Sequence, residues 1–399
     1  MTATEAFPQR EAGDLSARAA HLAAFRQLQH HGQMHDAAAH LARALELGAV
    51  VSLPFRGSQP VVRILVLQSI LGGNVLMHRF VDEQLHAVHV LLVEFWEPGM
   101  ALPEHDLVFQ AVGDADVRQE ALRQVERILA ETDAPVLNGP AAVRESARQR
   151  NADRLRLLAG VQTARTARAS RAELSRSTVE EILEQNQLCF PVLLRAPGFH
   201  MGQNCLLLSS AEAVAPALEQ LPGDEFLLME HLPVRSPDGW CRKYRVLFVD
   251  GHIYPVHLAI SSHWKVHYFS AEMATHAAHR AEEARFLNAM EETLGSAVLS
   301  SLQRIQQMLQ LDYAGVDFAL RAQGPDSRRE QARSGDAPRL LLFEANATMA
   351  VVRPPAEPMW AYRQAAVERI YRAFQAMLLQ RRRAGRCLRG AEVSLPVTL

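Results

Sequence analysis

Cysteine is scarce in this sequence, and its four cysteines lie far apart with no Cys-x-x-Cys pair. Secreted domains that depend on disulfides have denser cysteine spacing, so we expect reduced thiols in a cytoplasmic protein. Long hydrophobic runs are missing too: no stretch of 18 apolar residues occurs, and residues 1–14 include acidic side chains but no apolar core segment. These absences predict a soluble chain that does not associate with membranes.

A strong charge of either sign is also absent, because 42 Lys and Arg nearly balance 44 Asp and Glu and leave a formal charge of −2. This balance gives no general attraction to nucleic acid. The arginines concentrated between Arg381 and Arg386 are expected at the end of a helix over 358–383, where cations oppose the helix dipole before Gly385 ends the helix. Apolar residues are plentiful, at 48% of 399, which suffices for two or three domains.

Residues 15–47 show helical periodicity interrupted at Gly32, which predicts an antiparallel helix pair within an N-terminal segment over 1–55. The stretch 32–47, GQMHDAAAHLARALEL, resembles the second helix of a tetratricopeptide repeat. A single repeat cannot bury its apolar face without a neighbour. We therefore expect the helix pair to pack on the next domain or on a second copy of the chain, as in a homodimer.

Strands alternate with helices after a turn-rich linker at 54–60. Strands are expected at 61–68, 89–96, 106–116 and 135–140, and helices at 75–85 and 117–131. This alternation predicts an α/β domain over 56–140 with a parallel sheet and a ligand crevice at the carboxyl ends of its strands. Gly72-Gly73-Asn74 stands at such an end, but it forms neither a GxGxxG nor a Walker loop, so a tight turn is the simpler interpretation.

Two further helices are expected at 140–158 and at 175–186. The first carries five arginines, which indicate a solvated helix face or, for one of them, a phosphate-binding residue in a cleft. The second has Ser177 as its N-cap and Glu180 three residues later, which is the capping-box pattern.

A strand at 189–196 is followed by a loop that contains Gly198, His200 and Gly202, and then by another strand. Glycines allow the backbone to approach a ligand closely and leave amides free to donate, so this arrangement can close over a polyphosphate. Arg195, at the end of the first strand, can pair with phosphate oxygens or form a surface salt bridge.

The stretch EFLLMEHLPV predicts a strand that leaves its sheet at Glu230-His231-Leu232-Pro233. Backbone groups exposed there suit a planar base, and the carboxylate of Glu230 suits ribose hydroxyls. A hairpin follows over 240–269, with its turn at Asp250-Gly251. Lys243 and Arg245 are two residues apart, so both lie on one face of the strand, which favours an anion or is simply a solvated cationic face.

A second hairpin is predicted from YAGVDFAL (313–320) and RLLLFEA (339–345), with a long polar connection between them. Asp317 lies on the first strand. Glu344 and Asn346 lie two apart on the second and therefore share a face. Three hard oxygen donors on adjacent strands favour Mg²⁺ shared with substrate phosphates, whereas a solvated polar face is the plain alternative.

In this order of parts, residues 59–379 resemble an ATP-grasp protein. The resemblance rests on FPVLLRAPGFHMGQN, FLLMEHLP, RKYRVLFVDGHIYPVHLAI, YAGVDFAL and FEANATMAV. It implies a mixed α/β (α+β) ATP-grasp fold, in which a Rossmann-like pre-domain over 56–140 precedes a small subdomain over 141–235. A large subdomain with a C-terminal helix over 236–399 is then expected, with ATP between the two subdomains.

The resemblance also implies roles for residues. It assigns phosphate contact to Arg195 and the loop of Gly198, His200 and Gly202, the adenine-linking strand to Glu230, His231 and Leu232, and Mg²⁺ binding to Asp317, Glu344 and Asn346. The phosphate-binding lysines of the family are arginines here, namely Arg195 and one of Arg148, Arg150 and Arg154, of which we choose Arg154. Ala-Thr-Met-Ala after Asn346 also departs from the family, so a role for Arg353 is left open.

The implied reaction is the activation of a small-molecule carboxylate by ATP to an acyl phosphate, which an amine or similar nucleophile then attacks. Positioning and charge neutralisation dominate such chemistry. Arg245 and Lys265 are the expected electrostatic stabilisers, and His257 is a candidate for handling a proton. Two alternatives stay open: an ATP-binding scaffold without turnover, which the arginine replacements favour, and a small-molecule kinase.

Overall fold

The computed structural model describes residues 48–176, 179–199, 202–321 and 340–392, together with isolated positions between 21 and 44. The chain divides into two compact units, of which the first contains residues 1–112, 120–137 and 378–399 and the second 113–119 and 138–377. The helix pair predicted over 15–47, with its likeness to a tetratricopeptide repeat, lies outside the described residues except for those isolated positions.

The sheet of the first unit has five strands in the order β1-β3-β2-β4-β5. They are β1 (Val50–Ser52), β2 (Val62–Gln68), β3 (His86–Leu92), β4 (Leu107–Gln110) and β5 (Val136–Leu137). Strands β2 to β5 are parallel, and only the short edge strand β1 is antiparallel. Because a central parallel strand is covered on both faces, β2 and β4 are apolar almost throughout, as the sequence predicts. Helix α3 (Gln119–Leu129) also forms where it is expected.

The prediction of a helix at 75–85 is wrong. Only a short 3₁₀ turn, η1 (Met77–Arg79), forms there. Asn74 bonds back to Ser69 through both its side-chain atoms, at 2.9 and 2.7 Å, and the amide of Val75 donates to Ala111 O at 2.7 Å. The backbone is therefore held in extended form beside Ala111 and Val112, just after β4 ends, and this tertiary pairing overrides the helical periodicity.

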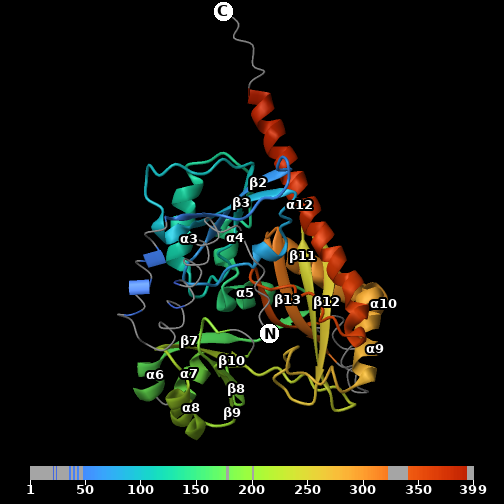
Figure 1. Cartoon of the computed structure of the whole chain (residues 1–399). Coiled ribbons are helices and arrows are strands. Elements are labelled where there is room, and N and C mark those ends of the chain that lie inside the picture. The colour runs from blue at the N-terminus through green and yellow to red at the C-terminus, as the bar shows by residue number, and fades with distance from the viewer. Residues whose placement is uncertain are drawn as a thin grey trace, which may run out of the picture. The chain divides into compact units, whose positions relative to one another are not determined.

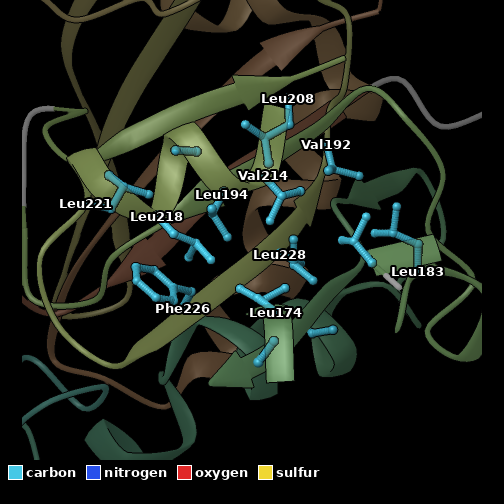
Figure 2. Packing of buried hydrophobic residues seen from close by; sticks show 14 of the residues in the cluster. Leu174, Leu183, Val192, Leu194, Leu208, Val214, Leu218, Leu221, Phe226 and Leu228 are labelled. Carbon is cyan, nitrogen blue, oxygen red and sulfur yellow. The ribbon is translucent and has the colours of Figure 1, made fainter. Parts of the chain in front are cut away.

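The second unit contains a small antiparallel sheet in the order β7-β10-β8-β9. Its strands are β7 (Thr166–Ser170), β8 (Val192–Arg195), β9 (Cys205–Leu208) and β10 (Glu225–Glu230), and its helices are α6 (Arg171–Arg176), α7 (Val179–Gln185) and α8 (Val214–Gln220), with η3 (Ala211–Ala213) before the last. The helices gather beside the sheet (Figure 1), and Figure 2 shows the apolar side chains between them. Val192 and Leu194 of β8 are fully buried in this core, so Arg195 is directed to the other face.

A larger sheet in the same unit has the order β12-β11-β13-β14-β6. It contains β6 (Val161–Thr163), β11 (Cys241–Val249), β12 (His252–Ser261), β13 (Tyr313–Leu320) and β14 (Leu340–Asn346). Both predicted hairpins are confirmed, because β11 pairs antiparallel with β12 and β13 with β14. Asp250 and Gly251 both have positive φ, 48° and 78°, as a two-residue hairpin turn requires.

Helices cover one face of the larger sheet. They are α9 (Ala277–Asn288), α10 (Met290–Leu309), η4 (Pro358–Arg363) and the start of α12 (Gln364–Glu392). Tyr244 of β11 packs edge-on against Phe286 of α9, with ring centroids 5.1 Å apart, and stacks on Phe318 of β13. Because side chains alternate along a strand, the neighbours Lys243, Arg245 and Asp317 lie on the opposite face, away from these helices.

Two helix predictions need correction. The helix expected at 140–158 forms as two, α4 (Pro140–Glu145) and α5 (Arg148–Leu155), because the extended backbone of Ala147 ends the first and the carboxylate of Asp116 accepts the Arg148 amide at 3.2 Å. Gly385 does not end α12, which continues to Glu392 at the modest cost that glycine imposes inside a helix. Among the described residues no helix combines the length and apolar character needed to cross a bilayer.

The core of the small sheet can be tested at Leu194, which is fully buried. Leu194→Ala should lower the free energy of local opening by about 2–5 kcal/mol, because it removes apolar contacts and leaves a cavity. Hydrogen exchange of the β8 and β10 amides measures this change. Leu157→Ala, at a side chain that is 80% exposed, should change stability by less than about 0.5 kcal/mol. Equal effects of the two substitutions would contradict the packing described.

Candidate functional site

A row of charged and polar side chains crosses the larger sheet. His257 of β12 pairs with Arg245 of β11, Arg245 with Asp317 of β13, and Asp317 with Glu344 of β14. Directly opposed residues on neighbouring strands lie within side-chain contact. The sheet thus assembles a proposed catalytic arginine, a candidate proton acceptor and two proposed metal ligands from four strands, and we call these four residues the polar row.

Irregular pairing aligns the polar row. Val246 pairs with Pro255, but the preceding Arg245 pairs with His257 and skips Val256. A second shift follows Asp317, between Asp317 and Phe318. Because one extra residue reverses the face on which all later side chains lie, the first bulge brings His257 to the face of Arg245, and the second brings Glu344 to the face of Asp317.

Asp317 is the most enclosed member of the polar row, with a side chain 3% exposed. Arg245 donates from Nε to Oδ1 at 2.6 Å and from Nη2 to Oδ2 at 2.8 Å, and Lys243 Nζ lies 3.1 Å from Oδ2. Burial opposes ionisation of the carboxyl, but the two cations outweigh burial and hold the pKa of Asp317 well below its usual value. Asp317 is therefore a carboxylate whose two oxygens are both engaged by cations.

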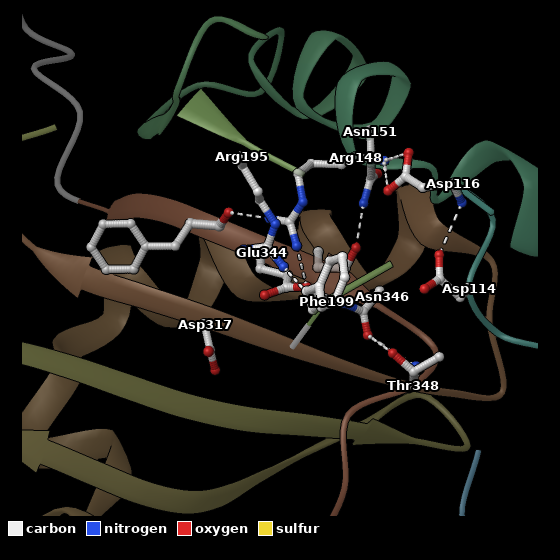
Figure 3. Close-up of polar contacts among 12 residues, drawn as sticks. Asp114, Asp116, Arg148, Asn151, Arg195, Phe199, Asp317, Glu344, Asn346 and Thr348 are labelled. Atoms are coloured by element: carbon white, nitrogen blue, oxygen red, sulfur yellow. Dashed lines mark hydrogen bonds and ion pairs between the residues drawn. The ribbon is translucent and has the colours of Figure 1, made fainter. Parts of the chain in front are cut away.

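Glu344 is held by a different pair of residues. Arg148 forms a short ion pair with Oε1, and Asn346 Nδ2 donates to the same oxygen at 2.7 Å. Burial disfavours the charge of Glu344, but Arg148 and then Arg195 keep the pKa of its carboxyl below the usual value. Figure 3 shows both guanidinium groups near Glu344. Asp116, a further partner of Arg148, is itself paired with Arg168 at 2.9 Å.

The predicted Mg²⁺ ligands offer suitable atoms, because all three present hard oxygens and Asp317 directly opposes Glu344. Asn346 Oδ1, however, accepts from the amide and the hydroxyl of Thr348, both at 2.9 Å. Across the described part of the chain no three His, Cys, Asp or Glu side chains cluster to hold a metal ion. The ligand set therefore fits Mg²⁺ in its chemistry, and it would accept the ion only after the present bonds to these oxygens are exchanged.

A pocket opens beside Glu344, and the empty space there amounts to about 730 Å³ when the open solvent at its mouth is counted. Its lining includes the apolar side chains of Leu155, Leu227, Met229 and Leu342. It also includes polar side chains, namely Asp114, Asp116, Arg148, Asn151, Arg195, Glu344 and Asn346, and Pro197, Gly198 and Phe199 of the glycine loop. A lining that combines apolar and charged side chains suits a ligand that has a flat apolar group and an anionic tail.

The predicted nucleotide contacts are partly assembled. Arg195 and Gly198 line the pocket, and Arg195 Nη2 donates to Phe199 O. Burial and then the like charge of Arg148 lower the pKa of Arg195, although Glu344 counteracts them. His200 lies outside the described residues. Gly202 packs against Lys265, since a Cβ at Gly202 would lie 3.1 Å from Lys265 Cδ.

Other predicted residues lie beside the pocket rather than in its lining. Arg154 donates to the backbone oxygens of Glu145 and Met308, at 3.1 and 2.7 Å, whereas Arg148 lies in the lining. Glu230 Oε2 accepts from the Arg165 amide at 3.1 Å. In the same strand it is Leu227 and Met229 that line the pocket, while His231 packs edge-on against Trp264 and Leu232 is buried.

Lys265 Nζ donates to Cys205 O at 2.8 Å, and this bond joins the segment after β12 to strand β9 of the small sheet. Arg353, whose role the sequence leaves open, pairs with Glu368 at 2.8 Å and lies 4.4 Å above the ring of Tyr371. Both contacts are with α12, so Arg353 has a structural partner on this helix.

A buried cluster next to His257 is not indicated by the sequence. Glu283 is fully buried and accepts hydrogen bonds from Tyr268 at 3.2 Å and Tyr362 at 2.5 Å, and Arg363 Nε lies 3.4 Å from its carboxylate. The ring of Tyr268 lies 4.6 Å from that of His257. These residues come from three distant segments with no shared motif, so only the fold brings them together.

The comparisons with known proteins concern fold. No family model and no curated protein matches the chain. Its structure is similar to those of D-alanine–D-alanine ligase from Bacillus anthracis complexed with ATP (12% identity, 82% of this chain and 98% of that chain, TM-score 0.45) and of the D-alanine–D-alanine ligase from Coxiella burnetii (11%, 84% and 100%, 0.46). It is also similar to the ATP-grasp ligase PsnB complexed with a precursor peptide and AMPPNP (15%, 81% and 99%, 0.43). Each TM-score is below 0.5, too low for a property of these enzymes to be inferred for this chain.

The buried imidazole of His257 predicts a dependence of stability on pH. Burial, and then Arg245, hold the pKa of folded His257 well below its ordinary 6.5. At pH values below about 6.5 the unfolded chain therefore binds a proton that the folded chain does not, so stability falls as the pH falls. Between about pH 7.5 and 5.5 the free energy of unfolding in urea should decrease less for His257→Gln than for the parent protein. An identical decrease in both proteins would show that His257 titrates normally.

Proposed function

We propose that this protein is an ATP-dependent ligase of the ATP-grasp type, which joins a small-molecule carboxylate to an amine and releases ADP and phosphate. The observation that supports the proposal best is the convergence of Arg148, Arg195, Lys243 and Arg245 on two carboxylates paired across β13 and β14. Asp114 and Asp116 lie in the same pocket lining and attract Arg148, and Arg168 pairs with Asp116, so five cations face four carboxylates and one positive charge is in excess. Arginines held by carboxylates beside a pocket can exchange these partners for phosphate oxygens, which a triphosphate supplies.

The pocket gives this anion its orientation. Leu227, Met229 and Leu342 of its lining suit an adenine ring, and Arg148 and Arg195 suit the phosphates. The glycine loop lies beside Arg195, as a phosphate contact requires. In this proposal Arg148 takes the role that the sequence assigns to Arg154.

Asp317, Glu344 and Asn346 are the proposed ligands of a magnesium ion, whose charge would neutralise phosphate oxygens. The protein's own cations neutralise the remaining phosphate charge. Arg245 and Lys243 are placed for this role by their position beside Asp317, in the middle of the sheet. The bidentate fork of Arg245, which now binds a carboxylate, has the geometry that also binds phosphate.

The proposed reaction has two steps. A carboxylate oxygen of the first substrate attacks the γ-phosphorus of ATP, the bond from that phosphorus to the bridging oxygen breaks, and ADP leaves an acyl phosphate behind. The amine nitrogen then attacks the acyl carbon, the bond from carbon to the phosphate oxygen breaks, and the nitrogen gives up a proton. Arg245 and Lys265 are the proposed stabilisers of the transferred group, and His257, which burial keeps neutral, is the proposed proton acceptor.

A second candidate is an ATP-binding protein without turnover. It is favoured by the paired state of Asp317, whose two oxygens are both engaged, and by arginines at the positions where the ATP-grasp resemblance implies lysines. Both candidates predict binding of Mg²⁺-ATP. They differ in that only the ligase forms an acyl phosphate.

Trapping of an acyl phosphate distinguishes the two candidate functions. With Mg²⁺-ATP and a panel of carboxylates, the ligase should release ADP and yield a hydroxamate when hydroxylamine is added. ATP binding in calorimetry without hydroxamate from any carboxylate would favour the second candidate. No binding of Mg²⁺-ATP at all would contradict both, and a phosphorylated product seen by mass spectrometry instead of free phosphate would identify a kinase.

Arg148 and Glu344 are expected to be essential. Arg148→Gln and Glu344→Gln should each lower ADP release by about 10²–10³-fold, because the first removes a fixed cation next to the phosphates and the second removes a carboxylate ligand of the proposed magnesium ion. Arg150→Gln is the matched control, since Arg150 lies two residues away on the same helix and pairs with Glu145 at an exposed position. A loss of activity in the control equal to that of Arg148→Gln would place the phosphates elsewhere.

A further inference from the structure

The paired state of Asp317 bears on how a nucleotide and a divalent cation enter the site. Arg245 binds both carboxylate oxygens and Lys243 binds one of them. The three side chains are only 3%, 14% and 18% exposed for Asp317, Lys243 and Arg245, so water replaces these contacts poorly. Breaking such a buried pair without a substitute leaves an uncompensated charge, which is strongly unfavourable.

Each ligand alone meets this obstacle. A divalent cation that reached Asp317 alone would displace Arg245 and Lys243 and leave them unpaired beside the new charge, next to Arg148 and Arg195 as well. A triphosphate that bound Arg245 and Lys243 alone would leave Asp317 unpaired and next to the phosphates. Only when both ligands enter does every charge keep a partner, because the carboxylate exchanges its cations for the metal ion while the cations exchange the carboxylate for phosphate.

We propose that Arg245 and Lys243 act as built-in counter-ions of Asp317. They prevent divalent cations from binding Asp317 until a triphosphate binds Arg245 and Lys243. This inference rests on the proposed function, because it assumes that a nucleoside triphosphate and a divalent cation use this site. It adds that the protein holds the cation only together with the triphosphate. Binding of the two is then thermodynamically coupled through one carboxylate and two cationic side chains.

Glu344 is not blocked from divalent cations in the way that Asp317 is. Its side chain is 25% exposed, and both of its described bonds, from Arg148 and Asn346, end on one oxygen, Oε1. Asp317, by contrast, has both oxygens bound and almost no exposure. The coupling is therefore expected to depend on Asp317 and its two partners.

The first experiment measures Mn²⁺ binding without nucleotide, from the electron paramagnetic resonance signal of free Mn²⁺. The parent protein should leave the ion free. Arg245→Gln should bind it, because it removes the bidentate partner of Asp317, and Lys243→Gln should bind it more weakly because Arg245 remains. Adding Asp317→Asn to Arg245→Gln should abolish the binding. Arg242→Gln, which removes a cation paired with Asp238 and Glu282 on the same strand, is the matched control and should leave the ion free.

The second experiment measures ATP binding without metal, by calorimetry in EDTA. Asp317→Asn should bind metal-free ATP at least about tenfold more tightly than the parent protein, because it frees both cations and removes a repelling charge. The same substitution should weaken binding of Mg²⁺-ATP relative to the parent. Opposite changes in the two affinities cannot arise from general damage to the fold, and circular dichroism checks that each variant is folded.

Three outcomes overturn the inference: Mn²⁺ binding by the parent protein without nucleotide, no gain of Mn²⁺ binding in Arg245→Gln, or unchanged affinity of Asp317→Asn for metal-free ATP. Each is distinct from a failure of the proposed function. If the parent protein binds Mg²⁺-ATP and these variants behave otherwise than expected, only the inference that Arg245 and Lys243 are counter-ions is wrong. If the parent protein does not bind Mg²⁺-ATP, the proposed function itself is wrong.

Discussion

The pairing of buried charges in the middle of the larger sheet is the constraint on which the site depends. Removing an ion from water costs several kcal/mol, and Asp317 is kept ionised because Arg245 lies directly opposite it and Lys243 follows on the same face. The other face of the same strands is apolar and packs on helices, as Tyr244 does on Phe286. Apolar packing on one face of the sheet thus helps to offset the free energy of burying charged groups on the other face.

The same constraint shapes the neighbouring segments. Arg148 is held at both ends, since its amide donates to Asp116 and its guanidinium pairs with Glu344. This attachment sets the start of α5 and thereby splits the helix that periodicity predicts as one. In the small sheet the alternation of β8 buries Leu194 and turns Arg195 toward the pocket, so packing of the core and delivery of a cation follow from one pattern.

Much of the fold could be predicted from the sequence, because strands and hairpins leave local signals. Examples are the parallel strands of the first unit and both hairpins of the larger sheet. The common face of Glu344 and Asn346 also follows from their spacing. What could not be predicted depends on contacts between distant segments. The segment 75–85 forms no α-helix because its start pairs with the chain just after β4, and the choice between Arg148 and Arg154 depends on where α5 begins. The cluster around Glu283 has no local signal at all.

The bulge at Val256 of β12 has a consequence for how this chain can vary in length. A substitution near it changes one side chain, whereas the loss of one β11 residue between Arg245 and the turn would shift Arg245 into the place of Val246 and reverse the face of the β11 residues beyond the deletion. Arg245 would then oppose Pro255 instead of His257 and would turn toward the helices. The hairpin can therefore tolerate changes of composition far better than insertions or deletions, so its residue count is as much a part of the site as its charged side chains.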